Sequence, residues 1–569
     1  MTCSKIFSGY LPELTNEIIE NFRYDYKTLH SCILVNRLWC CLAIPLLWED
    51  PFSIPTESYN FIEIYLRNLS EDDKMKLNKY GNNNLIPSNT LFNYPSFIKC
   101  LNTWKLSYST DKWISAVRPL TVEQPAKFST QNINLSSSHP NLDSLKFIFW
   151  LLFKVFINNG VNLRTFEIEI TETLDATDHE YFNSVFDLIL KNPNFIRNIK
   201  NLKLRFSETI TNITPFLKFL YSNCKSITSL YFRFPRNNND NDNLLIEKYL
   251  SRIINSQQNL KKIVFKRNNL FKGLSLLSFK SSNFSNTLKT IVFNKIDFKN
   301  LIILREVFDH LNILESIHIF YCRSLNIDFV QQIINITKPF KLRSLLMDEI
   351  LQIEPLQLLL QKSGDYLENV GFEPSLNNDL KQQLFEIIKN YCTKIKFFDL
   401  RGFNNQNIYT VLDSIKNIAQ NLNYLSIEVL SYHYQQSNSI IELSSIILVN
   451  LGQILPFKLE YLNLALVVNL NDLEKFLKNS QNTFIKKLLI RNDVIVENVN
   501  ILPFIKEYIM KKKKVKYLAI IETFFLGKIE DLSSCKDVVK EFELHGIKIK
   551  NYNELNTDCH NFIKELEWR

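Results

Sequence analysis

The stretches ITSLYF (227–232), LKKIVF (260–265) and LKTIVF (288–293) share one pattern, with apolar residues at the first, fourth and sixth positions. We count sixteen such hexads. They begin at Leu101, Leu142, Leu163, Ile199, Ile227, Leu260, Leu288, Leu314, Leu342, Leu367, Ile395, Leu422, Leu459, Ile485, Val515 and Val539. The fifteen intervals average about 29 residues, a period typical of solenoid repeats.

The alternating end of each hexad fits a short strand, because successive side chains of a strand point to opposite faces. Between hexads the apolar spacing becomes helical, as in 244–254, 329–336 and 380–388. A strand followed by a helix, repeated at this period, buries its apolar faces only by stacking on its neighbours. The pattern therefore predicts an α/β fold, a curved solenoid with a parallel inner sheet and outer helices.

The first fifty residues have a different pattern. Pro12 suits the first turn of a helix, Asp25 can cap a second helix, and Pro45 is expected to end a third. Apolar residues at helical spacing are Leu14, Ile18, Ile19, Phe22, Leu29, Cys32, Ile33, Leu38, Trp39, Leu42 and Ala43. Three such helices bury little apolar surface, so apolar residues at their edges call for a partner.

This segment resembles the F-box motif. The matching residues are Leu11, Pro12, Glu13, Ile18, Phe22, Leu29, Val35, Asn36, Arg37, Trp39, Leu47 and Trp48. The resemblance implies docking to a Skp-type adaptor, and through it to a cullin scaffold and a ubiquitin-conjugating enzyme. The interface residues that it implies are Leu11, Pro12, Ile18, Leu29, Val35, Trp39 and Trp48. Some of these must instead hold the three helices together, and the sequence does not divide the two sets.

The remaining chain resembles leucine-rich-repeat proteins. The stretch LESIHIFYCRSLNIDF, with Cys322, matches the cysteine-containing repeat that often accompanies F-boxes, although most units lack this signature. We expect an F-box at 1–50, a helical connector at 51–100 and an irregular solenoid of about sixteen units at 101–569. The resemblance implies a non-catalytic substrate receptor of an SCF-type ubiquitin ligase, whose solenoid binds an unidentified target protein. The alternative is a leucine-rich-repeat scaffold or binding module that acts without a ligase.

One set of inner-strand residues suggests a binding surface. Alternate positions of three neighbouring strands would present Lys203, Arg205, Tyr231, Arg233, Lys262 and Lys266. A basic strip with one aromatic residue suits an acidic or phosphorylated segment of a substrate. The alternative is an ordinary solvated surface.

Composition narrows the classes of protein to which the chain can belong. The formal charge of +9 over 569 residues is too mild for a nucleic-acid-binding signature. Residues 147–157 form the most apolar stretch, which is too short for a membrane span, and no signal peptide is visible at 1–10. Dispersed histidines and cysteines without a CxxC pair predict no metal, cofactor or catalytic centre. We expect a cytoplasmic or nuclear protein. The lysine run at 511–514 could serve nuclear import, and the alternative is a set of surface lysines that complement the end of a helix.

Overall fold

The structure is a computed structural model. It describes residues 12–54, 56, 59–78, 90–117, 140–170, 185–206, 213–235, 240–268, 271–347, 352–372, 378–402, 404–429, 437–494, 500–510, 515–524, 529–557 and 559–568. The lysine run at 511–514 lies outside these residues. The chain divides into two compact units, Met1–Ile263 with Leu274–Thr287, and Val264–Gly273 with Leu288–Arg569.

The first unit opens with helices. They are α2 (Pro12–Glu20), α3 (Tyr26–Cys32), α4 (Arg37–Leu47), α5 (Phe61–Leu66), α6 (Glu71–Asn78), α7 (Thr103–Val117) and α8 (Pro140–Asn158), with short 3-10 turns η1 (Pro51–Ser53) and η2 (Tyr94–Phe97). The expectation that Pro45 ends the third helix is wrong, because α4 continues through it to Leu47. Ile44 and Leu46 are buried on either side of Pro45, and their packing offsets the lost backbone hydrogen bond.

Four parallel strands follow one another in sequence order within the first unit. They are β1 (Cys100–Asn102), β2 (Thr165–Ile170), β3 (Asn201–Phe206) and β4 (Ser229–Arg233). The helices that accompany them are α10 (Ile213–Asn223), α11 (Asp240–Asn255), α12 (Leu274–Leu277) and α13 (Ser282–Ser285). Matching positions of β2, β3 and β4 lie side by side, as Glu167, Lys203 and Tyr231 do.

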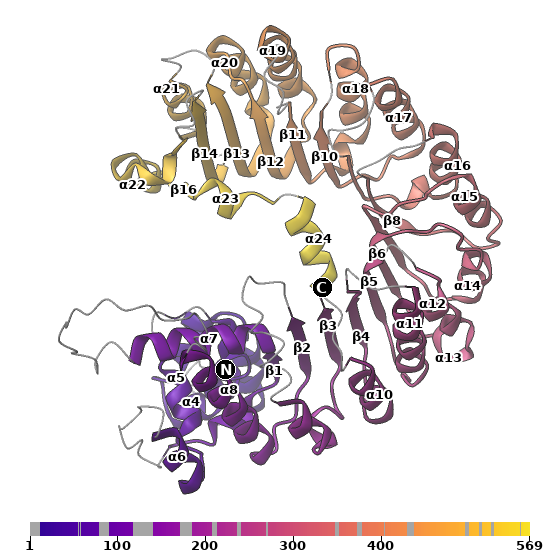
Figure 1. Cartoon of the computed structure of the whole chain (residues 1–569). Coiled ribbons are helices and arrows are strands. Elements are labelled where there is room, and N and C mark those ends of the chain that lie inside the picture. The colour runs from indigo at the N-terminus through magenta and orange to yellow at the C-terminus, as the bar shows by residue number, and fades with distance from the viewer. Residues whose placement is uncertain are drawn as a thin grey trace, which may run out of the picture. The chain divides into compact units, whose positions relative to one another are not determined.

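The second unit repeats the strand–helix alternation (Figure 1). Its strands are β6 (Thr290–Ile296), β7 (Ser316–Phe320), β8 (Leu342–Met347), β9 (Asn369–Phe372), β10 (Phe397–Arg401), β11 (Tyr424–Glu428), β12 (Lys458–Leu466), β13 (Phe484–Val494), β14 (Val515–Phe524), β15 (Ile529–Asp531) and β16 (Lys548–Ile549). Strand β5 (Lys262–Asn268) crosses the boundary between the units. Pairing is parallel from β6 to β14, and β15 is antiparallel to β14.

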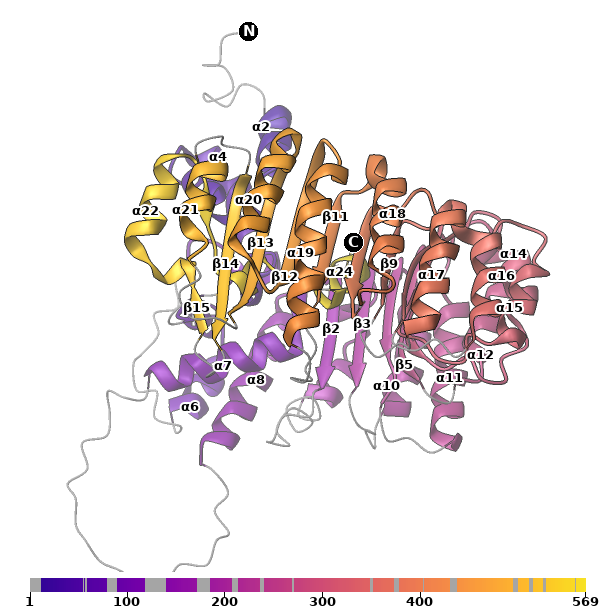
Figure 2. The ribbon, with the colours of Figure 1, turned by 90° about the horizontal axis from the view of Figure 1, so that it is seen from above.

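The second unit has these helices: α14 (Leu304–His310), α15 (Ile327–Ile334), α16 (Ile353–Ser363), α17 (Asn378–Tyr391), α18 (Ile408–Ile418), α19 (Ser437–Ile454), α20 (Leu470–Asn479), α21 (Leu502–Ile505), α22 (Lys536–Leu544), α23 (Tyr552–Leu555) and α24 (Cys559–Trp568). Figure 2 shows α17 to α20 side by side on the outer side of the strands. Helices α23 and α24 lie on the opposite, inner side (Figure 1).

The predicted α/β solenoid with a parallel inner sheet is confirmed, and thirteen of the sixteen hexads lie at strands. The other three expectations are wrong. The hexad at Leu101 gives a three-residue strand and then enters α7, while those at Leu142 and Val539 lie in α8 and α22. Apolar residues three apart suit a helix as well as a strand, so the longer helical pattern around each of these hexads prevails.

Phenylalanine rings fill the space between the sheet and the helices in the second unit. Phe265 stacks on Phe293, with ring centroids 5.8 Å apart. Phe293 contacts Phe298 edge-on at 5.2 Å, and Phe298 lies 4.9 Å from Phe329 of α15. Rings from successive repeats thus contact one another, which is how each repeat buries the apolar face of its neighbour.

Candidate functional site

The three N-terminal helices close around a core of their own. Asp25 caps α3 as expected, because its side chain accepts the Thr28 N–H at 3.1 Å, and Asn36 caps α4 by accepting the Trp39 N–H at 3.0 Å. These caps fix the turns that bring the helices together. The buried side chains are Ile19, Leu29, Cys32, Trp39, Ala43 and Leu46.

The structure divides the residues predicted to bind an adaptor into two sets. Leu29 and Trp39 are 0% and 7% exposed and belong to the core of the three helices. Pro12 and Val35 are exposed, and Ile18 is half-buried. Leu11 lies outside the described residues. Of the described residues predicted to bind, Pro12, Ile18 and Val35 are therefore the ones that a partner can reach most readily.

Trp48 makes its contacts within the chain. Its ring lies 4.3 Å from that of Tyr94 and edge-on to that of Tyr65 at 5.5 Å, and it also contacts Phe61. These aromatic residues belong to the segment that follows α4. Through these contacts Trp48 joins the three helices to the connector segment that follows α4. Its side chain is half-buried.

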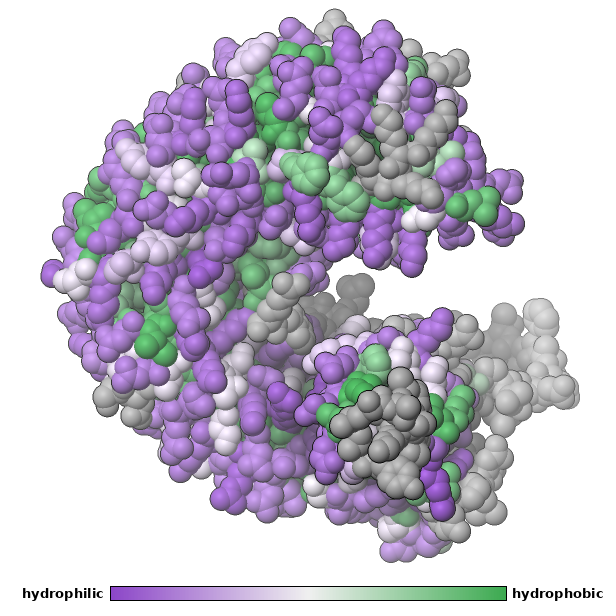
Figure 3. All heavy atoms as spheres, turned by 180° about the vertical axis from the view of Figure 1, so that it is seen from behind, coloured by the Kyte–Doolittle hydropathy of each residue, from purple (hydrophilic) through white to green (hydrophobic). Residues whose placement is uncertain are grey.

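Three exposed apolar residues were not among those predicted. Leu34, which directly precedes Val35 between α3 and α4, is 76% exposed, and Leu14 and Tyr24 are 43% and 85% exposed. Leu34 adjoins the motif, but nothing in the helical spacing indicates that it points outward. Figure 3 shows hydrophobic side chains on the surface of this helical part. Apolar side chains that stay in water beside a closed core favour an interaction surface.

The three helices are fixed to the first strand by direct bonds. The Glu49 carbonyl oxygen accepts the N–H groups of Lys99 and Cys100, at 3.0 and 3.1 Å, just where β1 begins. Arg23 Nη1 donates to both oxygens of the Glu49 carboxylate, at 2.8 and 2.9 Å. The end of α4 is thereby joined to the edge of the sheet in the first unit, without a free linker between them.

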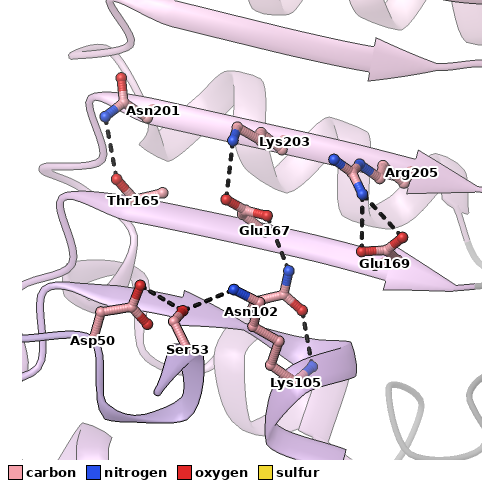
Figure 4. A network of polar contacts seen from close by, with 10 residues as sticks. All are labelled: Asp50, Ser53, Asn102, Lys105, Thr165, Glu167, Glu169, Asn201, Lys203 and Arg205. Carbon is pink, nitrogen blue, oxygen red and sulfur yellow. Dashed lines mark hydrogen bonds and ion pairs between the residues drawn. The ribbon is translucent and has the colours of Figure 1, made fainter. Parts of the chain in front are cut away.

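A chain of polar contacts continues from this junction onto the inner face of the sheet (Figure 4). The Asp50 carboxylate accepts the Ser53 hydroxyl, whose oxygen accepts from Lys105 Nζ at 2.8 Å. Burial raises the pKa of Asp50 and the hydrogen bond from Ser53 partly opposes this. On β1, Asn102 donates to the Glu167 carboxylate at 2.9 Å. The network thus links the end of α4, β1 and β2.

The predicted basic strip is largely paired within the chain. Lys203 Nζ lies 3.1 Å from Glu167, and Arg205 Nη1 donates to both carboxylate oxygens of Glu169, at 3.0 and 3.1 Å (Figure 4). Burial lowers the pKa of Lys203 to about 8, although Glu167 opposes the shift. The two glutamates occupy the matching inner positions of β2 and were not among the predicted residues.

The other predicted strip residues follow on β4 and β5. The Tyr231 ring is 4% exposed and lies 5.2 Å from the Arg205 guanidinium carbon. Arg233 pairs in register with Arg205 and is half-buried, as Lys262 is. Lys266 belongs to the second unit and is also half-buried. The structure thus brings Lys203, Arg205, Tyr231 and Arg233 together on the inner face, with glutamates beside the first two.

The described residues contain no group of three or more His, Cys, Asp or Glu side chains placed to hold a metal ion. Among the described helices, none is long and apolar enough to cross a membrane. No protein-family model matches the chain, and no curated protein matches its sequence.

Proposed function

We propose that this protein is the substrate-binding subunit of an SCF-type ubiquitin ligase. In this proposal α2 to α4 dock on a Skp-type adaptor, and the solenoid binds the target protein. The single observation that favours it is the exposure of Leu14 on α2 and of Leu34 and Val35 between α3 and α4, beside a core that is already closed. Such residues are costly in water and gain from coverage by a partner.

The junction at Glu49 supports the same proposal. A substrate receptor performs no bond-making chemistry, and its contribution is to raise the effective concentration of the target near the ubiquitin-conjugating enzyme. This effect depends on a defined distance between the docking helices and the bound target. The hydrogen bonds that the Lys99 and Cys100 N–H groups donate to the Glu49 carbonyl restrict that distance in the first unit.

Co-purification with a Skp-type adaptor tests the proposal. We expect the unmodified chain to retain the adaptor, and the double variant Leu34→Glu/Val35→Glu to lose it, because two carboxylates would have to be desolvated in the interface. Replacing Leu11 and Pro12 by alanine should weaken retention as well. The matched control is Ile302→Glu, an equally exposed apolar position of the second unit, 81% exposed, which should bind normally.

The alternative, a scaffold that acts without a ligase, predicts a different result. An unmodified, folded chain that fails to retain the adaptor would rule out the ligase proposal. Retention that the Leu34→Glu/Val35→Glu variant does not weaken would show that the exposed apolar residues are not the docking surface.

A further inference from the structure

Three aromatic residues form a row on the inner face of the second unit. Phe397, Tyr424 and Tyr461 occupy matching positions of β10, β11 and β12. Their ring centroids lie 6.1 and 5.8 Å apart. Leu425 and Leu462, the next residues along their strands, are fully buried on the opposite, helix-covered face. The row is therefore an apolar strip on the face that the outer helices leave open.

The segment after β16 covers this strip. Tyr552 of α23 is 5% exposed and packs with Tyr461, Leu489 and Ala519. Its hydroxyl donates to the Asn463 side-chain oxygen at 2.9 Å. Farther along, the Tyr461 hydroxyl donates to the Asn556 side chain and accepts the Thr557 N–H, both at 3.0 Å. Residues 552–557 are thus held to β12 by a buried ring and these three hydrogen bonds.

Helix α24 continues the coverage by a different contact. The Phe562 ring stacks on that of Phe397, with centroids 4.0 Å apart and planes inclined by 14°. Ile563 beside it is 1% exposed, whereas Asn561, Lys564 and Glu565 face solvent. The helix is amphipathic, with one aromatic side chain that adds a fourth ring to the row.

A helix as short as α24 is not stable by itself in water. Ten residues are too few for a stable isolated helix in water, so α24 depends on its contact with the sheet. Its attachment through residues 552–557 gives it an effective concentration on the order of millimolar at the aromatic row. A helix of another protein with the same pattern would have to compete with α24 for the contact with Phe397.

We propose that the Phe397 end of this row is a docking site for an amphipathic helix with an aromatic anchor, and that α24 occupies this site in cis. The partner is a protein segment that places a phenylalanine or a similar ring on Phe397 and an aliphatic residue beside it. This inference rests on the proposed protein-binding role of the solenoid, and it does not depend on adaptor docking.

A peptide-binding measurement tests this proposal. The probe is a fluorescent synthetic peptide of residues 557–569, and the protein is the chain shortened after Thr557, which keeps Tyr552 and Asn556. We expect the peptide to bind the shortened chain, and to bind the full chain at least about tenfold more weakly because α24 competes. A Phe562→Ala peptide should bind the shortened chain at least about tenfold more weakly. A Lys564→Ala peptide, changed at a solvent-facing position, is the matched control.

Two results would overturn the proposal. One is a folded shortened chain that fails to bind the peptide, and the other is equal binding by the full and shortened chains. If the shortened chain does not fold, full-length Phe562→Ala takes its place and should bind the unmodified peptide, since its own α24 has lost the anchor. Failure of that variant to bind would also overturn the proposal. Adaptor retention by the same preparations separates this outcome from failure of the proposed ligase role.

Discussion

Lys203 Nζ and Glu167 Oε1 lie 3.1 Å apart across β3 and β2, and both side chains are less than one-tenth exposed. A buried ion pair of this kind contributes little net stability, but removal of one partner leaves the other charge without compensation. The pair stands where the sequence predicted a surface for acidic ligands. Within the chain, Glu167 already provides the carboxylate that such a ligand would bring to Lys203.

Replacement of Glu167 by glutamine should destabilise β2 and β3. We expect the free energy of local opening to fall by about 3 kcal/mol, because Lys203 then stays buried without its carboxylate. Hydrogen exchange of the β2 and β3 amides measures this loss. The control is Glu315→Gln, which removes a carboxylate 2.7 Å from the exposed Lys289 and should change exchange little. Equal effects at the two positions would contradict the role assigned to burial.

The lowered pKa of Lys203 has a predicted pH signature. Between about pH 8, its folded pKa, and its ordinary value of 10.5, the unfolded chain binds more protons at this lysine than the folded chain does. The contribution of Lys203 to the unfolding free energy therefore rises with pH in this window and is constant below it. We expect wild type to gain up to about 3 kcal/mol relative to Lys203→Met between pH 7.5 and 10. Parallel pH curves for the two proteins would refute the lowered pKa.

Trp48 and Val35 belong to the same motif but should respond differently to alanine. Trp48→Ala removes a ring that contacts Tyr65 and Tyr94, and should lower the unfolding free energy of the helical part by about 2 kcal/mol. Val35→Ala, at a side chain 47% exposed, should change it by less than about 0.5 kcal/mol. Pulse proteolysis in urea measures both. A larger loss for Val35 would place it in the core.

The hydroxyl of Tyr552 offers a test of the segment on the inner face. Tyr552→Phe keeps the buried ring but removes the hydrogen bond to Asn463, which should cost about 1 kcal/mol. Limited proteolysis should then release residues 552–568 faster. Tyr409→Phe, at a residue 61% exposed, serves as the control and should leave the cleavage rate unchanged. Identical cleavage rates for wild type and both variants would indicate that this hydrogen bond does not hold the segment.

The sequence was sufficient to predict the strands of the repeat, but not the structure where the repeat begins and ends. Period and alternation identified thirteen strands, since each strand repeats a local signal. The same hexad at Leu142 belongs to α8, where apolar residues continue at helical spacing through Phe149 and Leu152. A six-residue window cannot separate the two structures, because both place apolar side chains three positions apart.

The candidate sites required contacts that no local pattern contains. The motif identified the three helices, but whether Leu29 or Val35 faces outward depends on how those helices pack. Tyr461 and Asn556 are 95 residues apart in sequence, so coverage of the inner face by this segment had no local signal. The glutamates at 167 and 169 did have a local signal in the sequence. They lie at alternate positions after Thr165 along β2, and alternate residues of a strand face the same side.

The carbonyl of Glu49 accepts the Lys99 and Cys100 N–H groups, and so closes the segment 50–98, which includes α5 and α6, into a loop whose two ends are held together. In an ordinary tether, adding residues lengthens the reach between the parts that it joins. Here insertions or deletions within the loop that spare the contacts of Trp48 would leave the distance between α4 and β1 unchanged. Related chains could therefore vary widely in the length of this loop while keeping the same spacing between their docking helices and their first strand.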